Sequence, residues 1–370
     1  MSNALNTTAL LADANCHRLI LQATLVPVTG DLFQPAGFPD IGHVIYDAPR
    51  KDGTKEKVCI VDSAASMANH LEAVSLASAQ TLELHPDLEG MPYLECLTDA
   101  PGSIGGTTPT RLVVTSLSEG HRLASSYFVE EKKATNGVLV RDGRVTTDKF
   151  ATALRNAFGL EDRTHPLPGD WWSVFRTIFR YDPNSLIHGI LFPAMGIKLS
   201  RVLTAHHEAF GADRVGLSGV KFDKLGKTTS GQPIFSVDKE TAREIRATFV
   251  IDLSLIRSFG RGTNGLSDNQ KLFLLELALW KIGRLLSGPY RFRSGCDLKL
   301  AALTRVEKGQ ATELPATELQ RDIAAAIRNA GFETPRITKV YWPANELFKA
   351  GNDDEQEAPE GEESGDETTE

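Results

Sequence analysis

Long hydrophobic runs are missing from this chain of 370 residues. A helix that crosses a bilayer needs about 18 to 20 consecutive apolar residues, and no stretch of the sequence approaches that length. The N-terminus also lacks the basic segment followed by an apolar segment that marks a secretory signal. We therefore expect a globular protein of the cytoplasm that does not act at a membrane.

Cysteine is scarce and scattered. The four cysteines are Cys16, Cys59, Cys96 and Cys296, and no two of them form a Cys-x-x-Cys pair. This spacing argues against a zinc site and against a disulfide framework. We expect reduced thiols that serve as small apolar side chains of the core.

Two common catalytic motifs are incomplete. The GKT triplet is typical of a phosphate-binding P-loop, but Lys221 stands where that motif requires a glycine. The segment GLSGV resembles a nucleophile elbow, but Val220 stands where the final glycine belongs. Neither segment therefore predicts a catalytic site, and we expect a protein that is not an enzyme and needs no cofactor.

The histidines give no clear metal or catalytic pattern. His206, His207 and Glu208 are metal-ligand types, but no His-Glu-x-x-His spacing follows, and we expect no metal. His188 lies in an apolar segment beside Gly189, which favours a core histidine over a contact to RNA. The segment FGRGTNG lacks the aromatic run of RNA-recognition domains, so any RNA would be contacted mainly along its backbone.

The net charge of −8 hides an uneven distribution. Residues 351–370 hold ten acidic and no basic side chains, so residues 1–350 carry 40 basic and 48 − 10 = 38 acidic ones. Within this body, residues 1–170 hold 14 basic and 21 acidic groups, whereas residues 171–310 hold 21 basic and 12 acidic groups. Clustered Lys and Arg favour a polyanionic partner, although a solvated basic face is a common alternative.

The best-patterned region is residues 247–306. Alternating apolar residues predict a strand over 247–257, and leucines at helical spacing predict a buried helix over 268–286 that starts at Ser267 with a capping box. A second strand is predicted over 296–306. The region is therefore predicted to be one strand-helix-strand unit, with the loop FGRGTNG and the basic turn GPYRFRSG on either side of the helix.

The rest of the chain gives shorter signals. Residues 1–15 are polar and are expected to be flexible, and the acidic tail 351–370 is expected to be disordered. Between these ends the patterns predict further elements: strands over 17–28, 58–61 and 337–342, a helix after 58–61 capped by Asp62 or Ser63, a hairpin turning at Asp142-Gly143, and helices over 147–158, 199–210 and 318–330.

Five segments taken together resemble a known family. They are FQPAGFPDIGHVIY, VDSAASMANHLE, FRYDPNSLIHGILFP, GLSGVKFD and GPYRFRSGCDL, and the similarity runs over nearly all of residues 15–345. The family is the CRISPR-associated backbone subunit of type I-G (formerly I-U) effector complexes, a member of the RAMP superfamily. The order and spacing of the segments carry this resemblance, because each one alone is weak.

The resemblance implies an α+β fold: a ferredoxin-like, RRM-like palm with large insertions that form finger and thumb elements. The palm with its insertions would occupy residues 16–350, with insertions near 29–57, 80–170 and 212–235. A ferredoxin-like domain contains two split β-α-β halves. Residues 17–28 with the Ser63 helix fit the first half, and residues 247–306 fit the second.

The resemblance also implies partners and a function. Several copies of such a subunit assemble along one CRISPR RNA together with other subunits, and pairing between guide and target DNA supplies the sequence specificity in antiviral defence. The protein then has to hold any RNA sequence. It would do so with basic and small polar groups that contact phosphate and sugar.

The RNA-binding candidates follow from the matched segments and from the basic region. Ser66 and Asn69 are expected to bond phosphate or a 2′-hydroxyl, and Met67 to pack against a base or sugar unless it is a core residue. Arg291 and Arg293, two apart in an extended segment, are expected to contact phosphate, with Phe292 pointing inward. The supporting candidates are Arg176, Lys198, Lys221, Lys224 and Arg261.

Two other functions stay open at this point. One is a metal-independent endoribonuclease of the same superfamily that processes CRISPR RNA, with His188 or His70 as general acid or base. The other is a protein-interaction module whose basic face meets an acidic partner.

Overall fold

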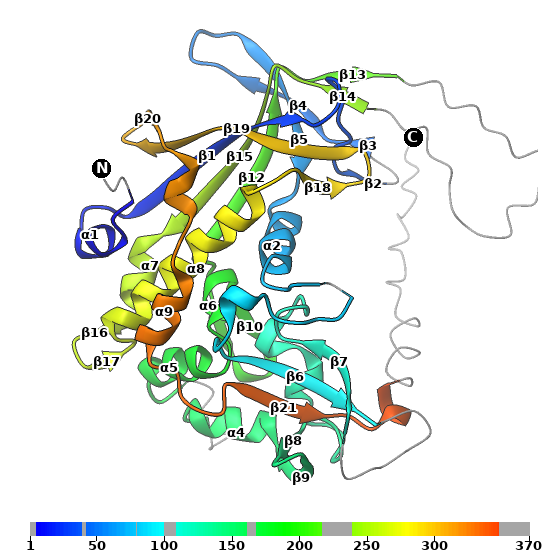
Figure 1. Cartoon of the computed structure of the whole chain (residues 1–370), viewed down its shortest axis with the longest axis vertical. Helices are drawn as coiled ribbons and strands as arrows, with labels where there is room; N and C mark the ends of the chain where they lie inside the picture. Colours follow the sequence, from blue (N-terminus) through cyan, green and yellow to red (C-terminus); the bar gives the residue numbers. More distant parts are fainter. Residues whose placement is uncertain are drawn as a thin grey trace, which may run out of the picture.

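The computed structural model describes residues 5–38, 42–78, 80–99, 109–160, 168–216 and 239–347. Over these residues the chain has an α+β fold, as the sequence predicts, with a large sheet above and a smaller sheet below in Figure 1 and helices between them. Lys221, Lys224 and the acidic tail lie outside the described residues.

The larger sheet is antiparallel throughout. Among the described residues its strands follow the order β18-β19-β1-β15-β12-β5-β4, and β20 pairs with β19. The strands are β1 (Arg18–Pro27), β4 (Ile45–Pro49), β5 (Lys55–Asp62), β12 (Leu203–Phe210), β15 (Glu244–Asp252), β18 (Tyr290–Arg293), β19 (Cys296–Glu307) and β20 (Gln310–Glu313).

The centre of this sheet contains two split β-α-β units. β15 and β19 run parallel on either side of β1, and the long helix α8 (Asp268–Leu286) connects them. β1 and β12 run parallel on either side of β15, and α2 (Ala64–Ala73) and α6 (Pro183–His188) come between them in the chain. This arrangement is the ferredoxin-like order, with long insertions between β1 and β12.

Side-chain alternation separates a covered face of the sheet from an open one. In β1, Leu21, Ala23 and Leu25 are buried, whereas Gln22 and Thr24 between them stay partly exposed. The buried residues of α8, capped by Ser267 and Gln270 as the sequence predicts, join the same core. The helices therefore cover one face of the palm sheet and leave a polar face open.

The helix predicted over 199–210 is wrong, because this segment contains β12. Leu203, Ala205 and Ala209 face the core while His206 and Glu208 face outward, which is the period of two of a strand. Alanine, leucine and glutamate are good helix formers, and pairing with β15 and β5 overrides that preference.

The strand-helix-strand prediction for residues 247–306 is confirmed, with two corrections. The first strand, β15, ends at Asp252, which caps the short helix α7 (Leu253–Ser258). The basic turn GPYRFRSG forms the edge strand β18, which pairs with β19. FGRGTNG forms a small hairpin of β16 (Gly260–Arg261) and β17 (Asn264–Gly265).

A smaller sheet contains strands from distant parts of the chain. Its described strands follow the order β7-β6-β21-β8-β9, and β21 (Ile337–Tyr341) runs parallel to β6 (Tyr93–Thr98). β7 (Arg111–Thr115), β8 (Val138–Arg141) and β9 (Arg144–Lys149) complete it. The hairpin at Asp142-Gly143 is confirmed, with φ positive at both residues as a two-residue turn requires.

The remaining elements are short and connect or cover the sheets. They are α1 (Thr7–Ala12), α3 (Ser126–Val129), α4 (Phe150–Ala157), α5 (Trp171–Tyr181), α9 (Ile323–Ala330), η1 (Pro86–Leu88), η2 (Arg122–Ala124), η3 (Pro193–Met195), η4 (Ala316–Leu319), β2 (Gly37–Phe38), β3 (Gly42–His43), β10 (Ile190–Phe192), β11 (Ile197–Leu199), β13 (Asp213–Val215) and β14 (Lys239–Thr241).

Residues 5–15 contain the helix α1 and pack against the core, whereas the sequence predicts a flexible segment over residues 1–15. Leu5 and Leu10 are buried in the core, and the Thr7 hydroxyl donates to Glu276 on α8 at 2.5 Å. The composition of the segment is mostly polar, so the sequence did not predict these contacts.

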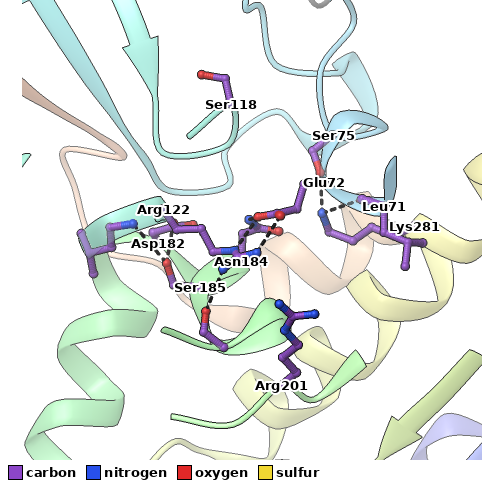
Figure 2. A network of polar contacts seen from close by, with 12 residues as sticks. Leu71, Glu72, Ser75, Ser118, Arg122, Asp182, Asn184, Ser185, Arg201 and Lys281 are labelled. Atoms are coloured by element: carbon purple, nitrogen blue, oxygen red, sulfur yellow. Dashed lines mark hydrogen bonds and ion pairs between the residues drawn. The ribbon is translucent and has the colours of Figure 1, made fainter. Parts of the chain in front are cut away.

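A buried polar network joins α2, α6, α8 and η2 (Figure 2). Arg122 donates to both carboxylate oxygens of Glu72 at 2.5 and 2.7 Å, and the Lys281 ammonium donates to the Leu71 carbonyl at 3.1 Å and to Ser75 at 2.6 Å. Burial raises the pKa of Asp182 in this network to about 6 and lowers the pKa of Lys281 to about 8. The network fixes α2 against the helices that support it.

Candidate nucleic-acid interface

The N-terminal turn of α2 lies at the end of β5 and faces solvent. Ser63 caps the helix, since its hydroxyl accepts a hydrogen bond from the backbone N–H of Ser66 at 3.1 Å, and Ala64 and Ala65 are exposed. The first backbone N–H groups of a helix have no partner within the helix and favour anions. The turn therefore suits a phosphate or a sugar hydroxyl.

Next to this turn, hydrogen bonds and ion pairs connect a group of polar side chains, here named the Asp62 cluster: Asp62, Ser66, His70, Tyr290 and Arg293. The Asp62 carboxylate accepts from Arg293 at 2.7 Å and from Ser66 at 3.0 Å, and it lies 3.1 Å from Nε2 of His70. The Tyr290 hydroxyl lies 2.8 Å from Nδ1 of His70. The cluster joins β5, α2 and β18.

Asp62 is the charged centre of this cluster. Burial alone would raise its pKa, but the hydrogen bond from His70 and the positive charge of Arg293 outweigh burial and lower the pKa below the ordinary carboxyl value. Asp62 therefore stays ionised and holds Arg293 in place. Burial raises the pKa of Tyr290 to about 12, so its hydroxyl stays protonated.

The Asp62 cluster also closes the curl of the large sheet. Arg293 on β18 donates to the carbonyl of Val61 on β5 at 3.0 Å, although four strands separate β18 from β5 in the sheet order. Figure 1 shows β18 and β5 at the same side of the sheet, above α2. Residues far apart in the sequence therefore meet at the start of α2.

Two further arginines lie on or near this surface. Arg291 is 70% exposed and pairs with Asp297 across its own hairpin at 2.8 Å. Arg201 is exposed, and its guanidinium lies 3.5 Å from the carbonyl oxygen of Ala64 in the first turn of α2. The predicted inward orientation of Phe292 is confirmed, because its side chain is buried.

The structure separates the three candidates predicted on α2. Ser66 is partly exposed within the Asp62 cluster, and Asn69 is exposed at a cleft of about 520 Å³ between α2 and β7. Met67 is fully buried in the core. The predicted contact of Met67 with a base or sugar is therefore corrected, because helical spacing turns its side chain toward the core.

Two of the described supporting candidates, Arg176 and Arg261, do not lie on this surface. Arg176 on α5 and Arg261 on β16 belong to elements at the other end of α8, where α5 packs against the β16–β17 hairpin. Lys198 is exposed on β11, opposite Leu191 of β10.

The histidines considered for catalysis are poorly placed for proton transfer. His188 is buried, neither ring nitrogen has a hydrogen-bond partner, and burial holds its pKa well below the ordinary value. It is a core histidine, but an unsatisfied one. His70 has both ring nitrogens facing Asp62 and Tyr290, and His207, whose pKa burial lowers to about 3, lies against Phe292.

Several polar residues that the structure leaves partly exposed were not singled out from the sequence. The open face of the palm sheet carries Gln22, Thr24, Thr204, Thr248 and Thr304, which are all partly exposed. Apolar residues alternate with polar ones over residues 203–210, and this strand pattern would have placed Thr204 on the open face. No local signal could have paired Tyr290 with His70, since 220 residues separate them.

The arrangement of exposed arginines and small polar groups around the first turn of α2 is suited to contact with a polyanion. Within the described ranges, no group of three or more His, Cys, Asp or Glu side chains is placed to hold a metal ion. The structure, where it is described, also contains no helix long and apolar enough to cross a membrane. The cysteines are free, and three of them, Cys59, Cys96 and Cys296, are buried as predicted.

Comparison with known proteins identifies the family. No curated protein matches the chain. The family model described as CRISPR-associated protein GSU0053 matches residues 19–214, which is 214 − 19 + 1 = 196 of the 370 residues and includes β1, β5, α2 and β12. Because the match covers more than half of the sequence, the chain belongs to this family of CRISPR-associated proteins.

Proposed function

We propose that this protein is a backbone subunit of a type I-G CRISPR effector complex, and that copies of it hold one CRISPR RNA in the cytoplasm. Other subunits complete the complex, and base pairing by the guide selects the target DNA. The family supports a role in CRISPR defence. The specific role as RNA-holding subunit is the proposal.

One observation carries the proposal: distant residues converge around the exposed first turn of α2. Arg291 and Arg293 lie on β18, Arg201 lies in the loop before β12, and Ser66 and Asn69 lie on α2 itself. Basic and small polar groups of this kind contact phosphate and sugar. Such contacts are the same for every RNA sequence, as a guide-holding subunit requires.

The surface around α2 lacks a described platform for reading or stacking bases. Tyr290 bonds His70, Phe292 is buried, and no exposed large apolar or aromatic side chain is found among the described residues of α2 and β18. Recognition of individual bases needs contacts to their edges or faces. The proposed binding at this surface is therefore independent of sequence.

We also propose that the subunit is not catalytic. His188 is buried and His70 is held at both nitrogens, so neither is free to accept a proton from a ribose hydroxyl in this conformation. Cleavage of repeat RNA by the purified protein, abolished in His70→Ala or His188→Ala, would contradict this part of the proposal and favour the endoribonuclease alternative.

The direct test is the nucleic acid that accompanies the protein. Protein purified at low salt should carry RNA of mixed sequence that dissociates at high salt, because each phosphate contact releases a counterion. Protein that carries no RNA and has no salt-sensitive affinity for added RNA would contradict the proposal. That result would favour a module that binds an acidic protein.

A further inference from the structure

An exposed aromatic ring lies at the other end of α8 from the Asp62 cluster. Trp171, the first residue of α5, is 41% exposed, whereas Trp280 and Trp342 are buried. Trp172 is half-buried. The Trp171 side chain is therefore accessible to a ligand that stacks on its ring.

The ring is supported from below by a chain of aromatic contacts. The ring centroids of Trp171 and Phe175 are 6.2 Å apart, and those of Phe175 and Phe259 are 5.0 Å apart. Phe259 leads directly into the β16–β17 hairpin, which begins at Gly260 and carries the exposed Arg261. The contacts therefore connect the exposed ring to the hairpin.

Close packing holds α5 against the hairpin. At Gly265, φ is +73° and an added Cβ would come within 2.7 Å of the Trp172 ring and 2.3 Å of the Phe259 carbonyl oxygen. Only glycine fits there. Asp170 fixes the start of α5, because its carboxylate accepts from the backbone N–H groups of Trp172 and Ser173 at 3.0 and 3.1 Å.

The charge on these two elements favours an anion. Residues 171–181 and 259–265 contain Arg176, Arg180 and Arg261 and no carboxylate. Arg176 lies 3.6 Å from Asp170 and Arg180 lies 3.0 Å from Glu333, but no described residue pairs with Arg261. An exposed ring on a helix that packs against the hairpin of an unpaired arginine suits a base and its phosphate, because every base has a face that stacks on an aromatic ring.

We propose that Trp171 stacks on an unpaired base of single-stranded nucleic acid while Arg261 contacts the adjoining phosphate. This site rests on the proposed function, and it adds base stacking at a surface distinct from that of the Asp62 cluster. Stacking tolerates any sequence, so it does not conflict with a subunit that holds every guide. The strand is the guide RNA or a single strand of target DNA, which share this chemistry.

Tryptophan fluorescence tests the site in the full chain. Twelve-nucleotide oligouridylate and oligoadenylate should quench the fluorescence of the wild-type protein, and Trp171→Phe should abolish most of the quenching while affinity changes less than about twofold. Trp171→Ala should weaken binding roughly five- to tenfold, in line with about 1 kcal/mol for one stacked base. Tyr46→Ala, which removes an aromatic ring of similar exposure on the edge strand β4, is the matched control and should leave affinity unchanged.

The sugar dependence identifies the strand. Quenching by RNA but not by the equivalent DNA would indicate the guide, the reverse would indicate target DNA, and equal quenching would indicate stacking on either. Binding seen by fluorescence anisotropy without quenching, and unchanged in Trp171→Ala, would overturn this site alone. Quenching that increases with protein concentration when no nucleic acid is present would overturn the proposed stacking site, because it would show that Trp171 contacts another protein molecule. Absence of any binding would overturn the proposed function as well.

Discussion

An arginine lies near each end of α8, and the two arginines have different surroundings. α8 has 19 residues, so its ends are about 28 Å apart at 1.5 Å per residue. At the C-terminal end, Arg293 binds a buried carboxylate and organises a polar surface. At the N-terminal end, Arg261 is exposed near a ladder of aromatic rings. Arg293 therefore stabilises the fold through its buried partner, whereas Arg261 is available to bind a ligand.

The largest expected effect is on stability, and it distinguishes Arg293 from Arg291 near the C-terminal end of α8. Arg293→Ala should lower the free energy of unfolding by about 3 kcal/mol, since it leaves Asp62 buried with less compensation. Arg291→Ala should lower it by less than about 1 kcal/mol, because Arg291 is exposed and its partner Asp297 stays partly exposed, so solvent screens the pair. Urea denaturation of the two variants measures this difference, and equal values would show that Arg293 is not an anchor.

The second effect concerns the buried network between the two ends. Asp182 has a pKa raised to about 6 in the folded protein from an ordinary value of 3.8, so the folded state binds this proton more tightly than the unfolded chain does. Its contribution should therefore reduce stability as pH rises from about 4 to about 6, by at most about 3 kcal/mol, and stay constant above pH 6. Denaturation across this range measures this contribution as the difference between the wild type and a variant without the carboxyl group, because the buried His188 and His207, whose pKa values burial lowers, change stability in the opposite direction. Asp182→Asn should remove it, and an unchanged pH profile in that variant would contradict the assignment.

The third effect should be confined to RNA binding. Arg291→Ala combined with Arg201→Ala should weaken affinity to a similar degree for unrelated RNA sequences. The slope of log affinity against log salt should become shallower by roughly 1 for each phosphate that is no longer neutralised. Arg144→Ala, an exposed arginine of the smaller sheet, is the control. A loss of affinity that depends on sequence, or an equal loss in the control, would remove the α2 surface from the interface.

The smallest effect tests whether the two ends act independently. Trp171→Ala combined with Arg291→Ala should lower RNA affinity by the sum of the two single changes, within about 0.5 kcal/mol, because the sites are far apart and share no described partner. Binding titrations of the three variants provide the comparison. A larger departure from additivity would mean that one RNA contact depends on the other.

Local patterns in the sequence were sufficient for the second half of the palm. Residues 247–306 contain a strand, a capped helix and a second strand with clear periods, and the structure follows them except at residues 253–258, which form α7. The same reasoning failed at β12, where helix-forming residues occupy a strand that is paired on both sides. Tertiary pairing decides such segments, and it cannot be read from a single short window.

The sequence patterns could not predict contacts between residues that lie far apart in the chain. β21 was predicted as a strand, but its parallel pairing with β6 joins residues more than 240 positions apart. The candidate site shows the same limit. Ser66 and Arg293 were both predicted as RNA contacts, yet their shared partner Asp62 was predicted only as a possible helix cap. The burial of Met67 follows from which side of α2 faces the core, which a short motif does not reveal.

Binding of RNA without regard to its sequence is tested most directly by the affinity of the purified full chain for two RNAs of equal length and unrelated sequence, measured at low and high salt. We expect similar affinities for the two RNAs and a parallel decrease of both as salt rises, because phosphate and sugar contacts dominate. Absence of binding at low salt, or a strong preference for one sequence that persists at high salt, would contradict sequence-independent binding.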